Sequence, residues 1–173
     1  MNHEMNRKSL LTLTSAMMLC LISATAANTQ AKPVPARGGN SSLAQQSLVG
    51  GMQLITPEDL VKILQAPKGV KPLILNIGPR VLYAQAHIPG AEFIGPTSEP
   101  QSLEALRIRV KSLPRGKLIV VYCGCCPWNH CPNVQPAYKM LSEMGFKRAA
   151  VLYIANNIGV DWVYRGYPTT RGQ

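Results

Sequence analysis

Four cysteines and one histidine occur within nine residues of the chain: Cys123, Cys125, Cys126, His130 and Cys131. The apolar run 118–122 before them predicts a strand, and residues 134–145 after them predict a helix. A cysteine between a strand end and a helix start lies near loop N–H groups and the positive end of a helix dipole, which both favour the reactive thiolate. The segment therefore predicts a site for sulfur or metal chemistry.

The spacing leaves several roles open for these side chains. Cys123 directly follows the predicted strand, so it is the expected nucleophile, with resolving or supporting roles for Cys125, Cys126, His130 and Cys131. Cys123 and Cys126 also form a C-x-x-C pair, which suits thiol–disulfide exchange. A soft-metal site would hold Cu(I) or Zn²⁺ by Cys123, Cys126, His130 and Cys131. Finally, two disulfides could pin the loop, in any of three pairings.

The N-terminus has the pattern of a secretory signal peptide over residues 1–26. Arg7 and Lys8 precede an apolar run at 10–22, and small residues at 24–26 form a cleavage site. The run is shorter than the roughly 20 residues that span a bilayer. We expect cleavage near Ala26 and a secreted or periplasmic protein, in a compartment where disulfides persist.

Composition indicates one packed domain. The chain has 173 residues and is 46% hydrophobic, and its formal charge is +10. Residues 27–50 are rich in proline, glycine and serine and predict a flexible tether, which leaves 51–173 as the domain. The basic residues are scattered and aromatic residues make up only 6%, so nucleic-acid binding is not expected. We expect a monomer, and an exported protein partner remains open.

Strands and helices are expected to alternate along the domain. Strands are expected over 52–55, 73–77, 93–94, 118–122 and 149–154. The helices between and after them are capped by Thr56, by Thr97 or Ser98, and by Asn133, with shorter ones at 81–84 and 160–165. This order predicts a three-layer α/β domain, with a mostly parallel sheet of about five strands between helices. Ligands bind such sheets at the carboxyl ends of the strands, where the cysteines follow.

Five motifs in this order resemble those of the rhodanese-like domain family. They are ITPEDL at 55–60, HIPGA at 87–91, VVYC at 120–123, LSEMGF at 141–146 and WVYRGYP at 162–168. The resemblance covers about residues 51–170. It implies a sulfurtransferase, thiosulfate-type, in which Cys123 carries sulfane sulfur as a persulfide and the loop amides from Gly124 onward cradle its charge. A small sulfur-containing anion or a thiol acceptor would be the partner, with no cofactor required.

The chain departs from the family pattern at three places. Asn76-Ile77-Gly78 stands where the family has Asp-Val-Arg, and Leu82 stands where it has glutamate. The segment from Cys123 to Asn133 is about twice as long as the family's loop and holds three more cysteines. The fold is therefore expected to carry over more fully than the activity.

Overall fold

A computed structural model describes residues 48–49 and 51–172. The predicted signal peptide, 1–26, and most of the predicted tether, 27–50, lie outside the described residues. Within the described part of the chain, no helix has the length and apolar character needed to cross a membrane.

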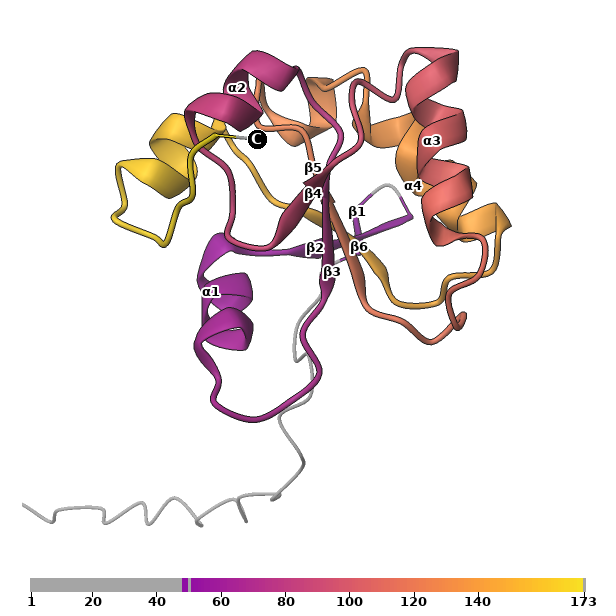
Figure 1. The fold of residues 1–173 in the computed structure, drawn as a ribbon, viewed down its shortest axis with the longest axis horizontal. Helices are drawn as coiled ribbons and strands as arrows, with labels where there is room; N and C mark the ends of the chain where they lie inside the picture. The colour runs from indigo at the N-terminus through magenta and orange to yellow at the C-terminus, as the bar shows by residue number, and fades with distance from the viewer. Residues whose placement is uncertain (1–47, 50, 173) are drawn as a thin grey trace, which may run out of the picture. The chain divides into compact units, whose positions relative to one another are not determined.

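The centre of the domain is a six-stranded sheet (Figure 1). In chain order the strands are β1 (Leu48–Val49), β2 (Met52–Ile55), β3 (Leu73–Asn76), β4 (Ala91–Phe93), β5 (Ile119–Tyr122) and β6 (Ala149–Leu152). Their order across the sheet is β1-β2-β6-β5-β3-β4, and only β1 runs antiparallel to its neighbour. The five parallel strands confirm the predicted α/β architecture, whereas β1 adds an edge strand from within the predicted tether.

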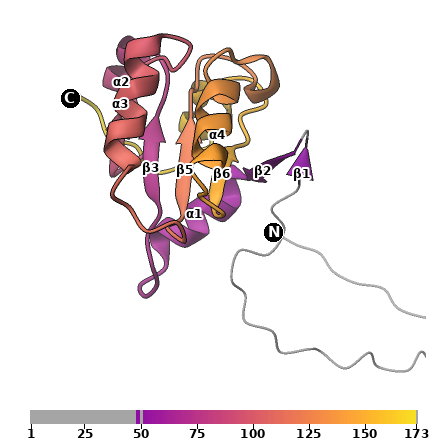
Figure 2. The ribbon, with the colours of Figure 1, turned by 90° about the vertical axis from the view of Figure 1, so that its right-hand side faces the viewer.

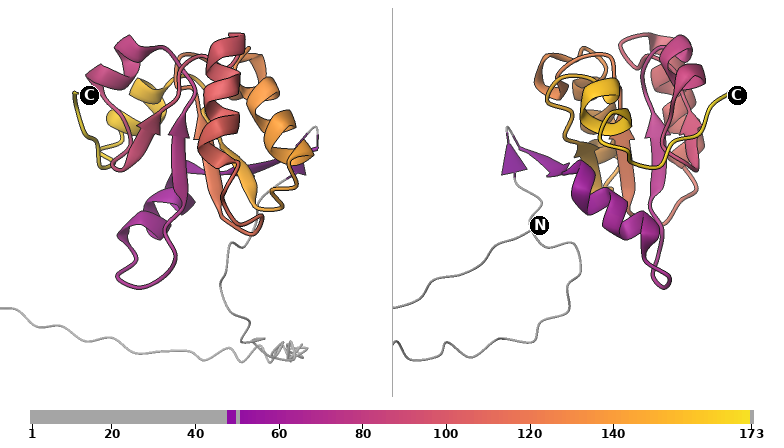
Figure 3. Two further views of the ribbon diagram at one scale, coloured as in Figure 1. Left: turned by 45° about the vertical axis from the view of Figure 1, so that its right-hand side comes forward. Right: turned by 90° about the vertical axis from the view of Figure 1, so that its left-hand side faces the viewer.

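Helices cover both faces of this sheet. They are α1 (Pro57–Gln65), α2 (Arg80–Gln85), α3 (Pro100–Val110) and α4 (Val134–Glu143), with a 3₁₀ turn η1 (Trp128–His130) and a π-helical turn η2 (Gly159–Val163). Figure 2 looks onto α3 and α4 in front of the strands. The right-hand view of Figure 3 looks onto the other face, with α1 and the yellow η2 toward the viewer.

The two faces of the central strands fill two separate apolar cores. On β3, Leu73 and Leu75 join the core under α3 and α4, while Ile74 between them joins the core under α1 and η2. Every residue of β3, β5 and β6 is buried. Central parallel strands show this burial because helices cover both sides, and it explains why their sequences are continuously apolar.

The predicted start of α3 is wrong. The helix begins at Pro100, and its N-cap residue Glu99 makes no side-chain capping hydrogen bond. Thr97 and Ser98, the expected caps, instead contact Asn133 at the far end of the cysteine loop: the Thr97 hydroxyl donates to its carbonyl oxygen at 2.6 Å. The Ser98 N–H donates to its side-chain Oδ1 at 3.0 Å. Thr97 and Ser98 have a high propensity to cap a helix, but here a contact with a distant part of the chain determines their hydrogen bonds.

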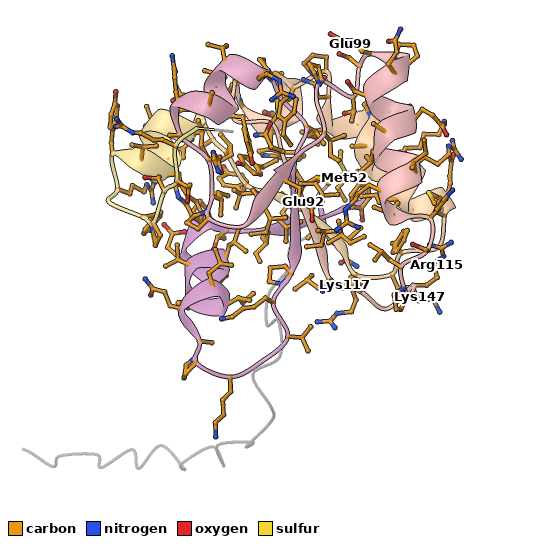
Figure 4. All side chains as sticks on the ribbon, viewed as in Figure 1. Met52, Glu92, Glu99, Arg115, Lys117 and Lys147 are labelled. Carbon is orange, nitrogen blue, oxygen red and sulfur yellow. The ribbon has the colours of Figure 1, made fainter. Side chains whose placement is uncertain are left out.

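Part of the positive charge lies at the end of the sheet opposite the cysteines. Lys117 and Lys147 each precede a parallel strand by two residues, so they lie at the amino ends of β5 and β6. Figure 4 shows them with Arg115, at the opposite end of α3 from Glu99. These cations therefore do not surround the cysteine loop.

Candidate active site

The cysteine loop, residues 123–133, joins the carboxyl end of β5 to α4, and its backbone is tied to the neighbouring chain. The Gly124 carbonyl accepts the Ile158 N–H at 2.9 Å, and the Trp128 N–H donates to the Ile154 carbonyl at 2.8 Å. Gly124 has a φ of +82°, and a Cβ there would lie 2.9 Å from the Ile158 side chain. The loop is long, but these contacts hold it over the end of β6.

Cys123 is buried at the beginning of this loop, with 4% of its surface exposed. Gly78, after β3, lies directly against it: a Cβ on Gly78 would be 2.3 Å from the Cys123 carbonyl oxygen and 3.1 Å from its Sγ. The Asn76 side chain accepts the Gly78 N–H at 3.1 Å and shapes this turn. The glycine that replaces the family's arginine therefore leaves room for the Cys123 backbone.

Asn133 connects Cys123 to the loop before α3. Its Nδ2 donates to the Cys123 Sγ at 3.3 Å, while its Oδ1 accepts the Ser98 N–H. A backbone N–H can only donate, so Ser98 fixes which end of the amide faces the sulfur. Asn133 occupies the N-cap of α4 as predicted, but its side chain makes no capping hydrogen bond. The sequence does not predict that the Asn133 amide faces the Cys123 sulfur, because the group that orients this amide, the Ser98 N–H, lies 35 residues away along the chain.

Asn133→Ala is expected to destabilise the fold by about 1–3 kcal/mol, because it removes the acceptor of the Ser98 N–H and the donor to Cys123. Asn129→Ala is the matched control, since Asn129 is exposed in the same loop. Urea unfolding of both variants measures the difference. Equal midpoints for the two would show that the buried amide contributes nothing.

The four loop sulfurs lie close together. The Cys125 Sγ is 3.2 Å from that of Cys123 and 3.1 Å from that of Cys126. The sulfurs of Cys123, Cys125 and Cys131 all lie within 4.8 Å of one another. All four side chains are free thiols, so the loop is not pinned by disulfides in this structure.

The structure also separates the candidate residues by exposure. Cys123 and Cys131 are buried, Cys126 is half-buried, and Cys125 and His130 are exposed. The close group of three sulfurs contains Cys125, whereas the metal set proposed from the sequence contains Cys126 and His130 in its place.

The expected thiolate character of Cys123 is not found. A hydrogen bond with Cys131 and burial raise the pKa of Cys123, and together they outweigh the Cys125 backbone N–H and the Asn133 amide, which lower it. Burial raises the pKa of Cys125 as well. Burial and the neighbouring Cys125 raise the pKa of Cys126 to about 11. Burial and contacts between thiols thus outweigh the amide donors and favour the protonated forms of Cys123, Cys125 and Cys126.

We expect the fold to lose stability as pH rises from about 9 to about 11. In the folded chain the pKa of Cys126 is raised from 9.0 to about 11, so the folded state keeps a proton that the unfolded state releases. The unfolded state then binds fewer protons, and the free energy of unfolding falls with pH. Urea midpoints measured between pH 8 and 11 test this. The decline should be shallower in Cys126→Ser, and identical slopes would contradict the assignment.

Comparison with known families identifies the domain. Residues 56–154 match the model of the rhodanese-like domain, more than half of the chain, and the protein belongs to this family. This confirms the resemblance seen in the five sequence motifs. A comparison with curated protein sequences finds no match.

Solved structures show the same fold at low sequence identity. The Alr3790 protein from Anabaena sp. is 20% identical with a TM-score of 0.52, over 68% of this chain and 92% of its own. Wild-type EanB is 20% identical with a TM-score of 0.51, over 73% of this chain and 29% of its own. A variant of EanB is also 20% identical, with a TM-score of 0.51 over 69% of this chain and 28% of its own. That variant carries a cysteine persulfide in a tetrahedral intermediate state with ergothioneine.

Proposed function

We propose that the protein is an exported sulfurtransferase that carries sulfane sulfur as a persulfide on Cys123. The observation that carries this proposal is the position of Cys123, the first residue after β5 at the carboxyl end of the parallel sheet. The Asn133 amide and the Cys125 backbone N–H both donate to its sulfur. Such donors stabilise the negative charge on a thiolate or a persulfide and suit a covalent sulfur carrier.

The first step takes sulfur from a small anion such as thiosulfate. Cys123 gives up its thiol proton as its sulfur attacks the outer sulfur of the donor; the donor's S–S bond breaks, and sulfite leaves with the bonding electron pair and takes up that proton. Cys123 then holds a persulfide whose outer sulfur comes from the donor; one S–S bond replaces another, so no further oxidant or reductant is needed. Because Cys123 is only 4% exposed, a small donor fits this step better than a large one.

Cys125 is placed to deliver the sulfur to a larger acceptor. Its sulfur contacts that of Cys123 at 3.2 Å, and its side chain is exposed. The Cys125 sulfur attacks the outer sulfur of the Cys123 persulfide while its thiol proton passes to the departing Cys123 sulfur, which moves the persulfide to Cys125 and frees Cys123 as a thiol. An acceptor thiol then attacks the outer sulfur of the Cys125 persulfide. Each step exchanges one S–S bond for another, so no further oxidant or reductant is needed.

Turnover with acceptors of two sizes tests this route. The reduced protein is supplied with thiosulfate and either cyanide, a two-atom acceptor, or glutathione, a tripeptide thiol. Cys125→Ser should slow transfer to glutathione much more than transfer to cyanide, while Cys126→Ser controls for the loss of a loop thiol. If the wild-type protein releases no sulfite with either acceptor, the proposed activity is refuted. Equal slowing with both acceptors would refute only the delivery role of Cys125.

Export is a separate part of the proposal and rests on the signal-peptide pattern of residues 1–26. Cell fractionation and the intact mass of the purified protein test it. We expect a mature chain that begins near residue 27 outside the cytoplasm, acting as a monomer. A cytoplasmic protein that keeps residues 1–26 would contradict export without affecting the chemistry at Cys123.

A further inference from the structure

Three sulfurs of the loop are arranged around one point in space. The Sγ atoms of Cys123, Cys125 and Cys131 lie within 4.8 Å of one another. For a metal–sulfur bond of about 2.3 Å, three sulfurs at the corners of a planar trigonal site are about 4.0 Å apart. The three thiols therefore need to move by less than about an ångström to share one ion.

The backbone holds the two buried sulfurs of this group. Cys123 follows β5 directly, and its sulfur accepts the Asn133 amide hydrogen bond. Cys131 lies between η1 and α4: its N–H donates to the Trp128 carbonyl and its carbonyl accepts the Val134 N–H, each at 3.3 Å. Cys125 is exposed and completes the group from the solvent side. A cation could therefore enter past Cys125 and meet two sulfurs that are already in position.

The chemistry of the ligands selects the kind of ion. Three sulfurs without a carboxylate form a soft donor set, which favours Cu(I) over harder cations. Structural Zn²⁺ sites take four protein ligands, whereas the close group here has three. His130, the imidazole of the loop, is exposed and lies outside this group.

We propose that Cys123, Cys125 and Cys131 form a three-thiolate binding site for one Cu(I) ion. The loop is about twice as long as the family's loop and holds three added cysteines. The proposed site assigns a function to two of them. The ion replaces the thiol protons and offsets the repulsion between neighbouring thiolates, so binding strengthens as pH rises. The site does not depend on sulfur transfer. The two uses exclude each other in one molecule, because a copper-bound Cys123 cannot attack a donor.

Copper titration of the mature chain tests the site. The protein is reduced and freed of metal under anaerobic conditions, its four thiols are counted, and Cu(I) is added in competition with bicinchoninate. We expect one tightly bound Cu(I) per chain. Cys125→Ser and Cys131→Ser should each weaken binding by more than about 100-fold. Cys126→Ser, whose sulfur lies outside the close group, should weaken binding much less than these two variants. Asn129→Ala, which changes an exposed residue of the same loop that has no thiol, is the control and should bind as the wild-type protein does.

Several outcomes would overturn the proposal. They are no binding by the fully reduced wild-type protein, unchanged affinity in Cys125→Ser, or loss of binding in Cys126→Ser equal to that in Cys125→Ser. Cys131 is buried, so the fold of its variant is checked by circular dichroism, whereas the exposed Cys125 gives a variant free of this concern. The experiment measures copper binding and not turnover, so its result tests the copper site independently of any sulfurtransferase activity.

Discussion

Cys123→Ser is expected to reduce kcat/KM for sulfur transfer at least about 10³-fold, the scale seen when a covalent nucleophile is removed. The serine oxygen is close to sulfur in position but is a far weaker nucleophile and cannot form a persulfide. Sulfite release from thiosulfate, with cyanide as the acceptor, measures the change. The small acceptor is chosen so that delivery through Cys125 does not limit the rate.

The matched control for this experiment is Cys126→Ser, which makes the same chemical change three residues further along the same loop. Cys126 lies next to Cys125 but outside the close group of three sulfurs. Its variant should keep most of the activity. A Cys123→Ser protein that is folded and retains more than about a tenth of the wild-type rate would place the nucleophile elsewhere.

Gly78→Ala is expected to have a large effect, because among the described glycines Gly78 is the one where an added Cβ would come closest to another atom. The new carbon would lie 2.3 Å from the Cys123 carbonyl oxygen, far inside normal contact, and the obstacle is backbone rather than a mobile side chain. The strand end or the cysteine loop must shift, which costs about 1–3 kcal/mol. Because Cys123 itself must shift, sulfur transfer should fall as well. Urea unfolding and the sulfite assay measure the two effects.

Gly116→Ala provides the control for this prediction. Gly116 lies in an exposed turn, its φ is outside the left-handed region, and a Cβ there would meet no atom within 4 Å. This variant should keep both stability and activity. Equal urea midpoints for the Gly78 and Gly116 variants would mean that the loop backbone does not lie against Gly78 as the structure has it.

Sequence reasoning predicted the fold well because the signals for it are local. Continuous apolar runs identified β3, β5 and β6, since central parallel strands are buried on both faces. Thr56 was predicted to cap α1, and its hydroxyl oxygen accepts the Asp59 N–H at 3.1 Å. Ordered motifs then gave the family, which the match over residues 56–154 confirms.

The details of the site could not be predicted because they depend on contacts between distant segments. The hydrogen bond that fixes Asn133 comes from Ser98, which local pattern reading assigned to a helix cap. Gly78 follows β3 and Cys123 follows β5, so their close approach depends on how these two strands pair in the sheet. The raised pKa of Cys123 depends on where Cys131 lies in the folded loop, and spacing along the chain does not give that position.

The most direct test of the central claim is intact mass spectrometry of the reduced, metal-free mature protein before and after thiosulfate, with peptide mapping of the product. The account predicts a mass increase of one sulfur atom, located on Cys123 and removed by cyanide. Cys125→Ser should still acquire this sulfur, and Cys123→Ser should not. A folded protein with four free thiols that gains no sulfur, or gains it only on another cysteine, would contradict the proposed role of Cys123.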